Sequence, residues 1–149
     1  MIIDWRLYEF RELPIALLYQ IMAARHEVFI VEQNCPYLDA DGYDNQALHL
    51  CGLHQGKMVA YSRLFGPNIK YSDASVGRVL TTKEVRRQGV GKQLMVESIA
   101  YCRQLFPRSP IRISAQSYLE RFYNELGFQT VGSEYLEDGI PHHEMIFHA

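Results

Sequence analysis

One segment is more informative than the rest of the chain, and it reads Val85-Arg86-Arg87-Gln88-Gly89-Val90-Gly91-Lys92. It follows a predicted strand and precedes the most regular predicted helix, over 91–106. Glycines let the backbone approach a ligand closely, and the first amides of a helix lack intrahelical partners and attract an anion. The cations Arg86, Arg87 and Lys92 add positive charge around those amides. We therefore expect this segment to bind a pyrophosphate.

Two common nucleotide-binding motifs do not match this segment. A P-loop requires Ser or Thr after G-K, but Gln93 follows Gly91-Lys92, and Arg86 stands in the place of its first glycine. A dinucleotide fingerprint requires a third glycine, where this chain has Leu94. The plain alternative is a glycine-containing helix start with exposed arginines.

Hydrophobic periodicity predicts a mixed α/β chain without repeats or linkers. The prolines at 107 and 110 end the helix over 91–106, and Gly127 ends the last predicted helix. The hairpin turn expected at Gln55-Gly56 joins two antiparallel strands. Strands are expected within 1–10 and over 48–54, 57–64, 75–81, 111–114, 128–135 and 142–147, and helices over 14–29, 91–106 and 119–126.

Composition excludes several classes of protein. The chain has 149 residues, 48% of them apolar, which suffices for one sizeable core. Its 15 Lys and Arg against 17 Asp and Glu give a net charge of −2, so no general basic field for nucleic acid exists. No apolar run reaches the length of a membrane span and no export signal is apparent. Three widely spaced cysteines without C-x-x-C favour reduced thiols in the cytoplasm and no metal site.

Two motifs carry a resemblance to a known family. Arg86-Arg87-Gln88-Gly89-Val90-Gly91 resembles the R-x-x-G-x-G/A signature of the GCN5-related N-acetyltransferases (GNAT), and Phe122-Tyr123-Asn124-Glu125-Leu126-Gly127-Phe128 resembles their F-Y-x-x-x-G-F motif, in the family's order and spacing. Four further segments resemble the ElaA-like branch of this family. They are Val28-Phe29-Ile30-Val31-Glu32-Gln33, Arg78-Val79, Ala115-Gln116 and Glu137-Asp138-Gly139-Ile140-Pro141-His142.

The resemblance implies a single N-acetyltransferase domain over 1–149, with a splayed, mostly antiparallel mixed sheet flanked by helices. It implies acetyl-CoA as co-substrate, wedged between the segment before the 91–106 helix and the strand preceding it. Main-chain groups of that strand would pair with the pantetheine arm, and one of its amides would polarise the thioester carbonyl. Gln116 stands where many relatives carry an asparagine that bonds the pantetheine. Cofactor contacts are thus expected from Val79, Leu80, Thr81, Arg86, Arg87, Gln88, Gly89, Val90, Gly91, Lys92 and Gln116.

Tyr123 matches the family's general acid, which protonates the departing CoA thiolate. By itself it is equally well explained as a core aromatic residue, because it shares a stripe with its apolar neighbours. A direct attack by an amine also requires a proton acceptor, and the strand before the phosphate-binding segment carries no carboxylate. Glu32 and Glu144 are therefore the expected substrate-side catalytic residues, although an ion pair with Arg25 is a rival role for Glu32. The remaining base candidates are His142 and His143, which ordinary surface positions would explain equally well.

Two acidic segments bear on the acceptor. Residues 26–56 contain no Lys or Arg and five carboxylates, and residues 134–144 add four more. If both lie at the open end of the cleft, carboxylates such as Glu32 and Asp44 would attract an ammonium ion. The alternative is a pair of solvated acidic loops that keep the protein soluble.

The sequence therefore predicts a cytoplasmic enzyme that moves an acetyl group from acetyl-CoA to the primary amine of a small molecule or peptide. No metal, nucleic acid or membrane partner is expected, and a homodimer is left open. Two alternatives use the same fold. One is a non-catalytic acyl-CoA sensor or interaction module, which the missing base favours and Tyr123 disfavours. The other is an acyl-CoA-dependent lactone synthase, which requires a long acyl tunnel.

Overall fold

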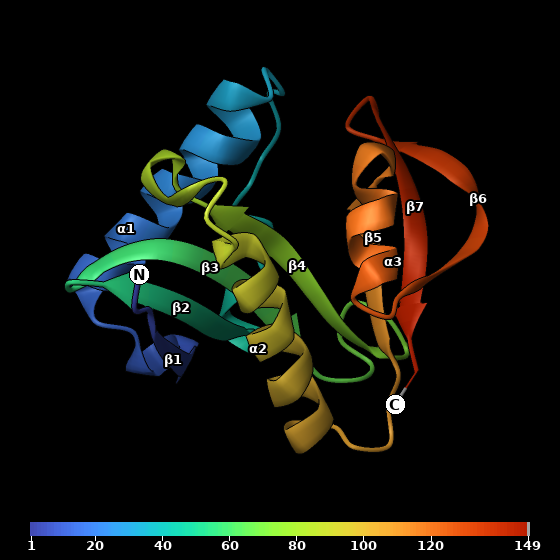
Figure 1. Ribbon diagram of the computed structural model, residues 1–149, viewed down its shortest axis with the longest axis horizontal. Coiled ribbons are helices and arrows are strands. Elements are labelled where there is room, and N and C mark those ends of the chain that lie inside the picture. The colour runs from blue at the N-terminus through green and yellow to red at the C-terminus, as the bar shows by residue number, and fades with distance from the viewer. Residues whose placement is uncertain (149) are drawn as a thin grey trace.

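The computed structural model describes residues 1–148, which form a seven-stranded sheet in the order β1-β2-β3-β4-β5-β7-β6 (Figure 1). Every neighbouring pair is antiparallel except β4 and β5, which are parallel. This confirms the expected mixed, mostly antiparallel sheet. The strands are β1 (Asp4–Glu9), β2 (Leu48–His54), β3 (Lys57–Phe65), β4 (Ala74–Thr81), β5 (Ile111–Gln116), β6 (Gln129–Glu137) and β7 (Ile140–Phe147), and the helices are α1 (Ile15–Arg25), α2 (Val90–Leu105) and α3 (Glu120–Glu125).

Helices α1 and α2 cover opposite faces of the first half of the sheet. On β3, Met58 and Tyr61 pack in a cluster with Leu17 and Ile21 of α1, whereas its neighbouring residues pack with α2. Side chains alternate across a strand, so β3 is buried on both faces. The turn at Gln55-Gly56, with both residues at positive φ, confirms the predicted hairpin of β2 and β3.

The first helix is shorter than expected. Regular α-helix ends at Arg25, and the chain continues as a π-helical segment over His26–Glu32. The wider π turn changes the angular spacing of side chains, which a 3.6-residue periodicity does not reveal. The last helix is also brief, because a 3₁₀ turn over Ser117–Leu119 precedes it.

The feature that positions the site is the divergence of β4 from β5. The two strands pair only at Ala74 with Ile111 and at Ser75 with Arg112. Beyond these positions β4 remains paired with β3, and β5 with β7. The edges of β4 and β5 that face each other therefore separate, as the open V in Figure 1 shows.

Two further properties of residues 1–148 concern the cysteines and the length of the helices. Cys35, Cys51 and Cys102 are buried and form no disulfide with one another. Within the same residues, no helix combines the length and the apolar character that crossing a membrane requires.

Candidate active site

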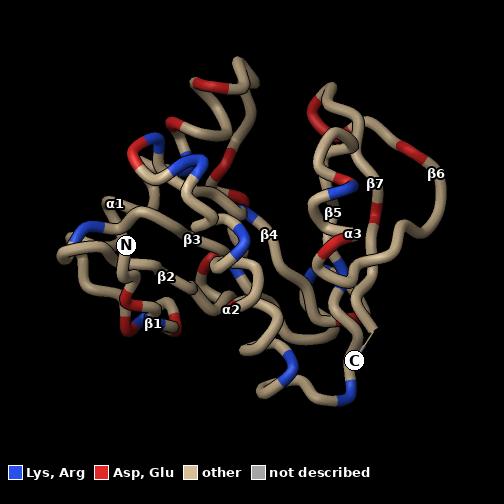
Figure 2. The backbone as a smooth tube through the Cα atoms, in the orientation of Figure 1, with Lys and Arg blue, Asp and Glu red and all other residues tan. Residues whose placement is uncertain are grey.

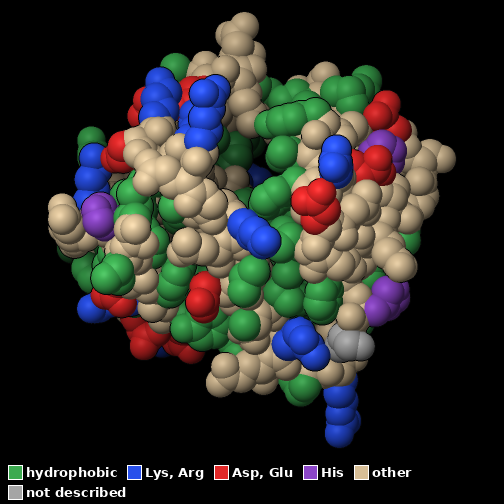
Figure 3. Space-filling model, in the orientation of Figure 1, with side chains coloured by type: hydrophobic (Ala, Val, Ile, Leu, Met, Phe, Trp, Pro, Cys, Tyr) green, Lys and Arg blue, Asp and Glu red, His purple; other side chains and the backbone are tan. Residues whose placement is uncertain are grey.

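A cleft of about 840 Å³ lies between the separated parts of β4 and β5. Figure 3 shows it as a hollow between the two halves of the molecule. Residues 76–81 of β4 form one wall and residues 113–116 of β5 form the other. The cleft also reaches Arg86 before α2, Tyr123 on α3 and the turn between β6 and β7. It therefore brings together residues that are far apart in the sequence.

The predicted phosphate-binding segment lies at one end of this cleft. Gly89 caps α2 with φ 78°, a left-handed conformation that glycine adopts without strain. Arg87 also has positive φ, at 65°. The first amides of α2 have no partners within the helix, and Lys and Arg residues gather in the segment before it (Figure 2). These features are typical of an anion-binding helix start, here at the amino end of a helix of 16 residues.

Glu32 lies at this phosphate end and not beside Arg25. Its carboxylate is 2.9 Å from the Nη2 atom of Arg86, and Lys83 lies 3.8 Å away. Arg86 also donates to the carbonyl oxygen of Thr81, which ties the segment to the end of β4. The rival ion pair between Glu32 and Arg25 is therefore not formed.

The main-chain contacts to pantetheine are predicted on the free edge of β4. Val79, Leu80 and Thr81 line the cleft, and Gln116 faces them from the end of β5. Backbone groups on such an edge are unpaired and can bind an extended ligand as an added strand. Arg78, just before them, has φ 49°, and the pairing of β3 with β4 shifts register at this point. The bulge turns this part of β4 away from a regular ladder.

Tyr123 lines the cleft. Its ring packs edge-on against Phe122 and Phe128, and its exposed fraction is 7%. Burial raises the pKa of its hydroxyl to about 12. The phenol therefore stays protonated at neutral pH, as a proton donor requires.

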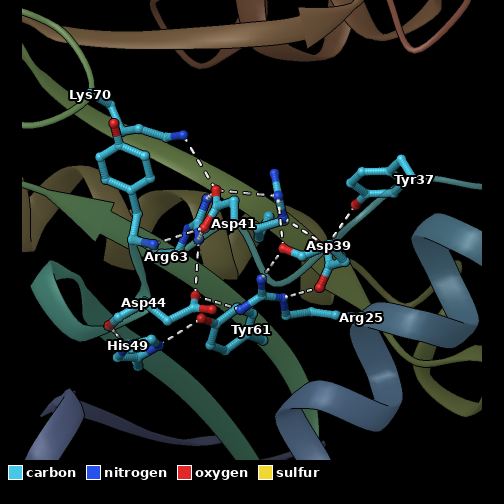
Figure 4. A network of polar contacts seen from close by, with 11 residues as sticks. Arg25, Tyr37, Asp39, Asp41, Asp44, His49, Tyr61, Arg63 and Lys70 are labelled. Carbon is cyan, nitrogen blue, oxygen red and sulfur yellow. Dashed lines mark hydrogen bonds and ion pairs between the residues drawn. The ribbon is translucent and has the colours of Figure 1, made fainter.

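A network of buried ion pairs lies behind the cleft (Figure 4). The guanidinium of Arg25 binds Asp39 and Asp44, each at 2.7 Å, and Arg25 and Asp39 have no exposed side-chain surface. Tyr37 donates to Asp39 at 2.6 Å. Burial alone would raise the pKa of the Asp44 carboxyl, but hydrogen bonds and charges from Arg25 and Arg63 outweigh it and lower this pKa.

The front of the same network lines the cleft. Arg63 binds Asp41 through both terminal nitrogens, at 2.8 and 2.7 Å, and Lys70 lies 3.3 Å from the same carboxylate. Arg78 donates from Nε to Asp39 at 2.9 Å and contacts Asp41 at 3.5 Å through Nη2. Burial would raise the pKa of Asp41, but the hydrogen bonds from Arg63 and the Tyr43 amide hold it well below its usual value. The acidic segment is thus neutralised internally.

The opposite wall, formed by β6 and β7, is acidic. Glu137 and His142 line the cleft, with His142 Nε2 3.4 Å from the Glu137 carboxylate. The His142 Nδ1 atom lies 2.7 Å from the carbonyl oxygen of Ile140, so the proton of the neutral ring belongs on Nδ1. Ser114 contacts both Tyr135 and Glu137. An imidazole so held can accept a proton on Nε2 beside a carboxylate that stabilises the resulting charge.

The other candidates for the base lie elsewhere. Glu144 binds Arg112 at 3.0 Å and is not among the residues that line the cleft. His143 points to Ser117 and Glu120, on the other face of β7. His142 is the one histidine lining the cleft among residues 1–148.

Sequence reasoning missed Arg63 and Lys70, and it included Glu137 only as one of the carboxylates of residues 134–144. Arg63 offered a signal, since it is a charged residue inside a strand whose other positions are almost all apolar. Lys70 and Glu137 lie in a turn and at a strand end, where charged residues are ordinary. Within residues 1–148 no three His, Cys, Asp or Glu side chains are arranged to hold a metal.

A splayed sheet with a cleft that reaches the start of a long helix and a buried tyrosine is the architecture of the acyl-CoA-dependent acyltransferases. Residues 27–148 match the acetyltransferase (GNAT) domain family. The chain belongs to this family.

Similar proteins span the whole chain. UPF0039 protein sll0451 of Synechocystis is 43% identical, over 99% of this chain and 96% of its own length. Protein ElaA of Escherichia coli is 37% identical, over 94% and 93%. The crystal structure of ElaA has a TM-score of 0.92, and that of an acyl-CoA N-acyltransferase from Pseudomonas aeruginosa has 0.94, each at 36% identity and covering 99% of this chain and 100% of the other. These matches confirm the predicted fold and its ElaA-like resemblance.

Proposed function

We propose that the protein transfers an acetyl group from acetyl-CoA to a primary amine by direct attack on the thioester. The observation that carries the proposal is the continuity of the cleft. The same cleft includes Arg86 before α2, the free edge of β4, Tyr123, and charged and aromatic residues on both of its walls.

Each part of acetyl-CoA has residues in or beside the cleft that suit it. The amides at the start of α2, with Arg86, Arg87 and Lys92, suit the pyrophosphate. The edge of β4 suits the pantetheine arm, and the amide of Val79 follows the bulge where the thioester carbonyl would lie. The thioester supplies an activated acetyl group, and no metal is needed for its transfer.

In the proposed reaction the amine nitrogen forms a bond with the acetyl carbon, and the bond from that carbon to sulfur breaks. Tyr123 gives its proton to the departing thiolate. The proton leaving the amine passes to His142 Nε2, directly or through one water, and Glu137 stabilises the imidazolium. Of the four candidates for the base, His142 thereby takes this role, and not Glu32 or Glu144, which were the expected substrate-side residues. Glu32 instead holds Arg86 at the phosphate end.

The experiment is a thiol-release assay with acetyl-CoA and a panel of amines, polyamines and amino-terminal peptides. Amine-dependent release supports the enzyme, whereas tight acetyl-CoA binding without release for any amine supports the alternative of a sensor. A parallel series of longer acyl-CoA chains tests the acetyl preference, since a lactone synthase would favour the longer chains.

A further inference from the structure

Resting on the proposed function, we infer that the acceptor amine also carries a carboxylate, which binds to Lys70 and Arg78 on the wall of the cleft opposite Glu137. The acceptor end of the cleft has one cationic and one acidic wall. A zwitterion such as an amino acid matches both walls.

Where the buried network reaches the cleft, its cations outnumber its carboxylates. Four cations and three carboxylates meet there: Arg25, Arg63, Lys70, Arg78, Asp39, Asp41 and Asp44. Asp41 alone of these carboxylates lines the cleft, whereas three of the cations line it. Asp39 and Asp44 lie behind, where both bind Arg25 and also pair with Arg78 and Arg63 respectively. The wall therefore presents a surplus of positive charge to the cleft.

The cations on this wall also retain unused donors. Arg78 employs Nε and Nη2 on its aspartates, which leaves Nη1 for a ligand, and 22% of its side chain is exposed. Lys70 is 31% exposed, and its contact with Asp41, at 3.3 Å, is longer than a strong charge-assisted bond. Arg63 is buried, and its Nε has no hydrogen-bond partner within residues 1–148. Because Asp39 also pairs with Arg78 and Asp44 with Arg63, the three carboxylates together leave the four cations of the network with one unbalanced positive charge.

The fold holds these donors in place. The Lys70 ammonium lies 4.1 Å from the centre of the Tyr43 ring, and the guanidinium of Arg63 lies over Phe65. Arg78 is fixed through Asp39 to the buried Arg25. Donors held in this way lose little entropy when they bind an anion.

The opposite wall suits the amine. Glu137 attracts an ammonium, which releases one proton to solvent before attack, and His142 beside it takes the second proton as the amide forms. A purely cationic acceptor would place like charges against Lys70 and Arg78, which disfavours diamines and polyamines. The acidic segments therefore do not make a general trap for cations, because most of their carboxylates near the cleft are already paired.

The test uses matched acceptors that differ only in the carboxylate. Glycine, β-alanine, γ-aminobutyrate, tyrosine, arginine and lysine are each compared with the amine that lacks the carboxylate, in a thiol-release assay with acetyl-CoA. In glycine, β-alanine and γ-aminobutyrate the distance between amine and carboxylate increases, so the best substrate of the three indicates the distance between the two walls. We expect at least one carboxylated member to exceed its partner in kcat/KM by roughly 10- to 100-fold, the range that one charge-assisted hydrogen bond supports.

Variants connect the preference to the wall. Lys70→Glu should abolish this preference by raising KM for the carboxylated acceptor, and Lys70→Gln should reduce it with less disturbance of folding. Lys57→Gln removes a lysine that pairs with Glu84 outside the cleft and should leave the preference unchanged. Thermal unfolding of each variant checks that it is folded.

The outcomes separate the two proposals. Failure of the wild type to bind acetyl-CoA in calorimetry overturns the proposed function and the inference with it. If acetyl-CoA binds and some amine is acetylated, the inference alone is overturned by better transfer to the decarboxylated partner in every pair, by no transfer to any carboxylated amine, or by an unchanged preference in folded Lys70 variants. If acetyl-CoA binds and no amine reacts, the proposed function is overturned in favour of the sensor.

Discussion

The Nε atom of Arg78 lies 2.9 Å from Oδ1 of Asp39, an ion pair that joins the left-handed residue of β4 to a carboxylate with no exposed surface. A residue other than glycine is strained at φ 49°. The ion pair with Asp39 offsets this backbone strain and holds the bulge in place. The next residue, Val79, carries the amide proposed to face the thioester carbonyl. The buried network is thereby connected to the reacting group.

Arg78→Gly tests this connection. Glycine adopts the positive φ without strain but removes the ion pair. We expect acetyl-CoA to bind nearly as well, while the infrared stretch of the thioester carbonyl of bound [1-¹³C]acetyl-CoA shifts toward its value in water. Arg78→Lys should retain part of the wild-type shift. An unchanged carbonyl stretch in Arg78→Gly would show that the ion pair does not position the amide.

Replacing Gly89 and Gly91 together with Val should weaken CoA binding strongly. Gly89 needs its left-handed conformation, and side chains at either position would obstruct the approach of a pyrophosphate to the amides. Calorimetry with CoA measures the effect. Gly132→Val is the matched control, because Gly132 also has positive φ and open space around it but lies on β6. Equal affinity in the double variant and the wild type would refute the pyrophosphate site.

Tyr123→Phe should lower kcat by roughly 10² to 10⁴, the usual range for a positioned proton donor, with little change in acetyl-CoA affinity. Because burial raises the pKa of Tyr123 to about 12, its ionisation should cause no loss of rate below about pH 11. Stopped-flow measurement of the chemical step over pH 6 to about 10 checks both points. Tyr101→Phe, on α2, serves as a control. A wild-type kcat in Tyr123→Phe would show that Tyr123 is only a packing residue of the hydrophobic core.

Acid should destabilise the fold through Asp41 and Asp44, whose pKa values are lowered in the folded state. A carboxyl with a depressed pKa stabilises the fold above its unfolded pKa, about 4, and this stabilisation is lost as pH falls toward the folded value. Urea unfolding at pH 7, 5, 4 and about 3 should show decreasing stability. Asp41→Asn should be less stable at pH 7 and lose less on acidification. Asp4→Asn, from an exposed pair with Arg6, should match the wild type throughout.

Local patterns were enough to predict most elements of the fold. The segment before α2 was identified because glycines, cations and a regular helix are adjacent in the sequence. The β2–β3 hairpin was identified because its turn residues have a known conformational preference. The π-helical segment after Arg25 was missed because the apolar spacing continues through it.

The chemistry of the acceptor side could not be predicted in the same way. Arg25, Arg63 and Arg78 come from three elements, and only the register of β3 with β4 and the packing of α1 bring them to the same aspartates. His142 and Glu144 lie on the same face of β7. His142 is opposite Gln116 of β5, at the end where β5 has separated from β4. Glu144 lies beside Arg112, closer to the end where β4 and β5 are paired. The point of separation is a tertiary property.

The two ladder positions that join β4 to β5 have a consequence for the lifetime of the protein. A pantetheine arm lying along β4 would act as a missing strand between the two half-sheets. We expect those amide hydrogens of residues 76–81 that point into the cleft, away from β3, to exchange readily with solvent in the free protein and to become protected when CoA binds. A ligand that binds only the folded chain also stabilises it in proportion to the logarithm of its concentration. The cellular pool of CoA would then set how long each molecule resists proteolysis.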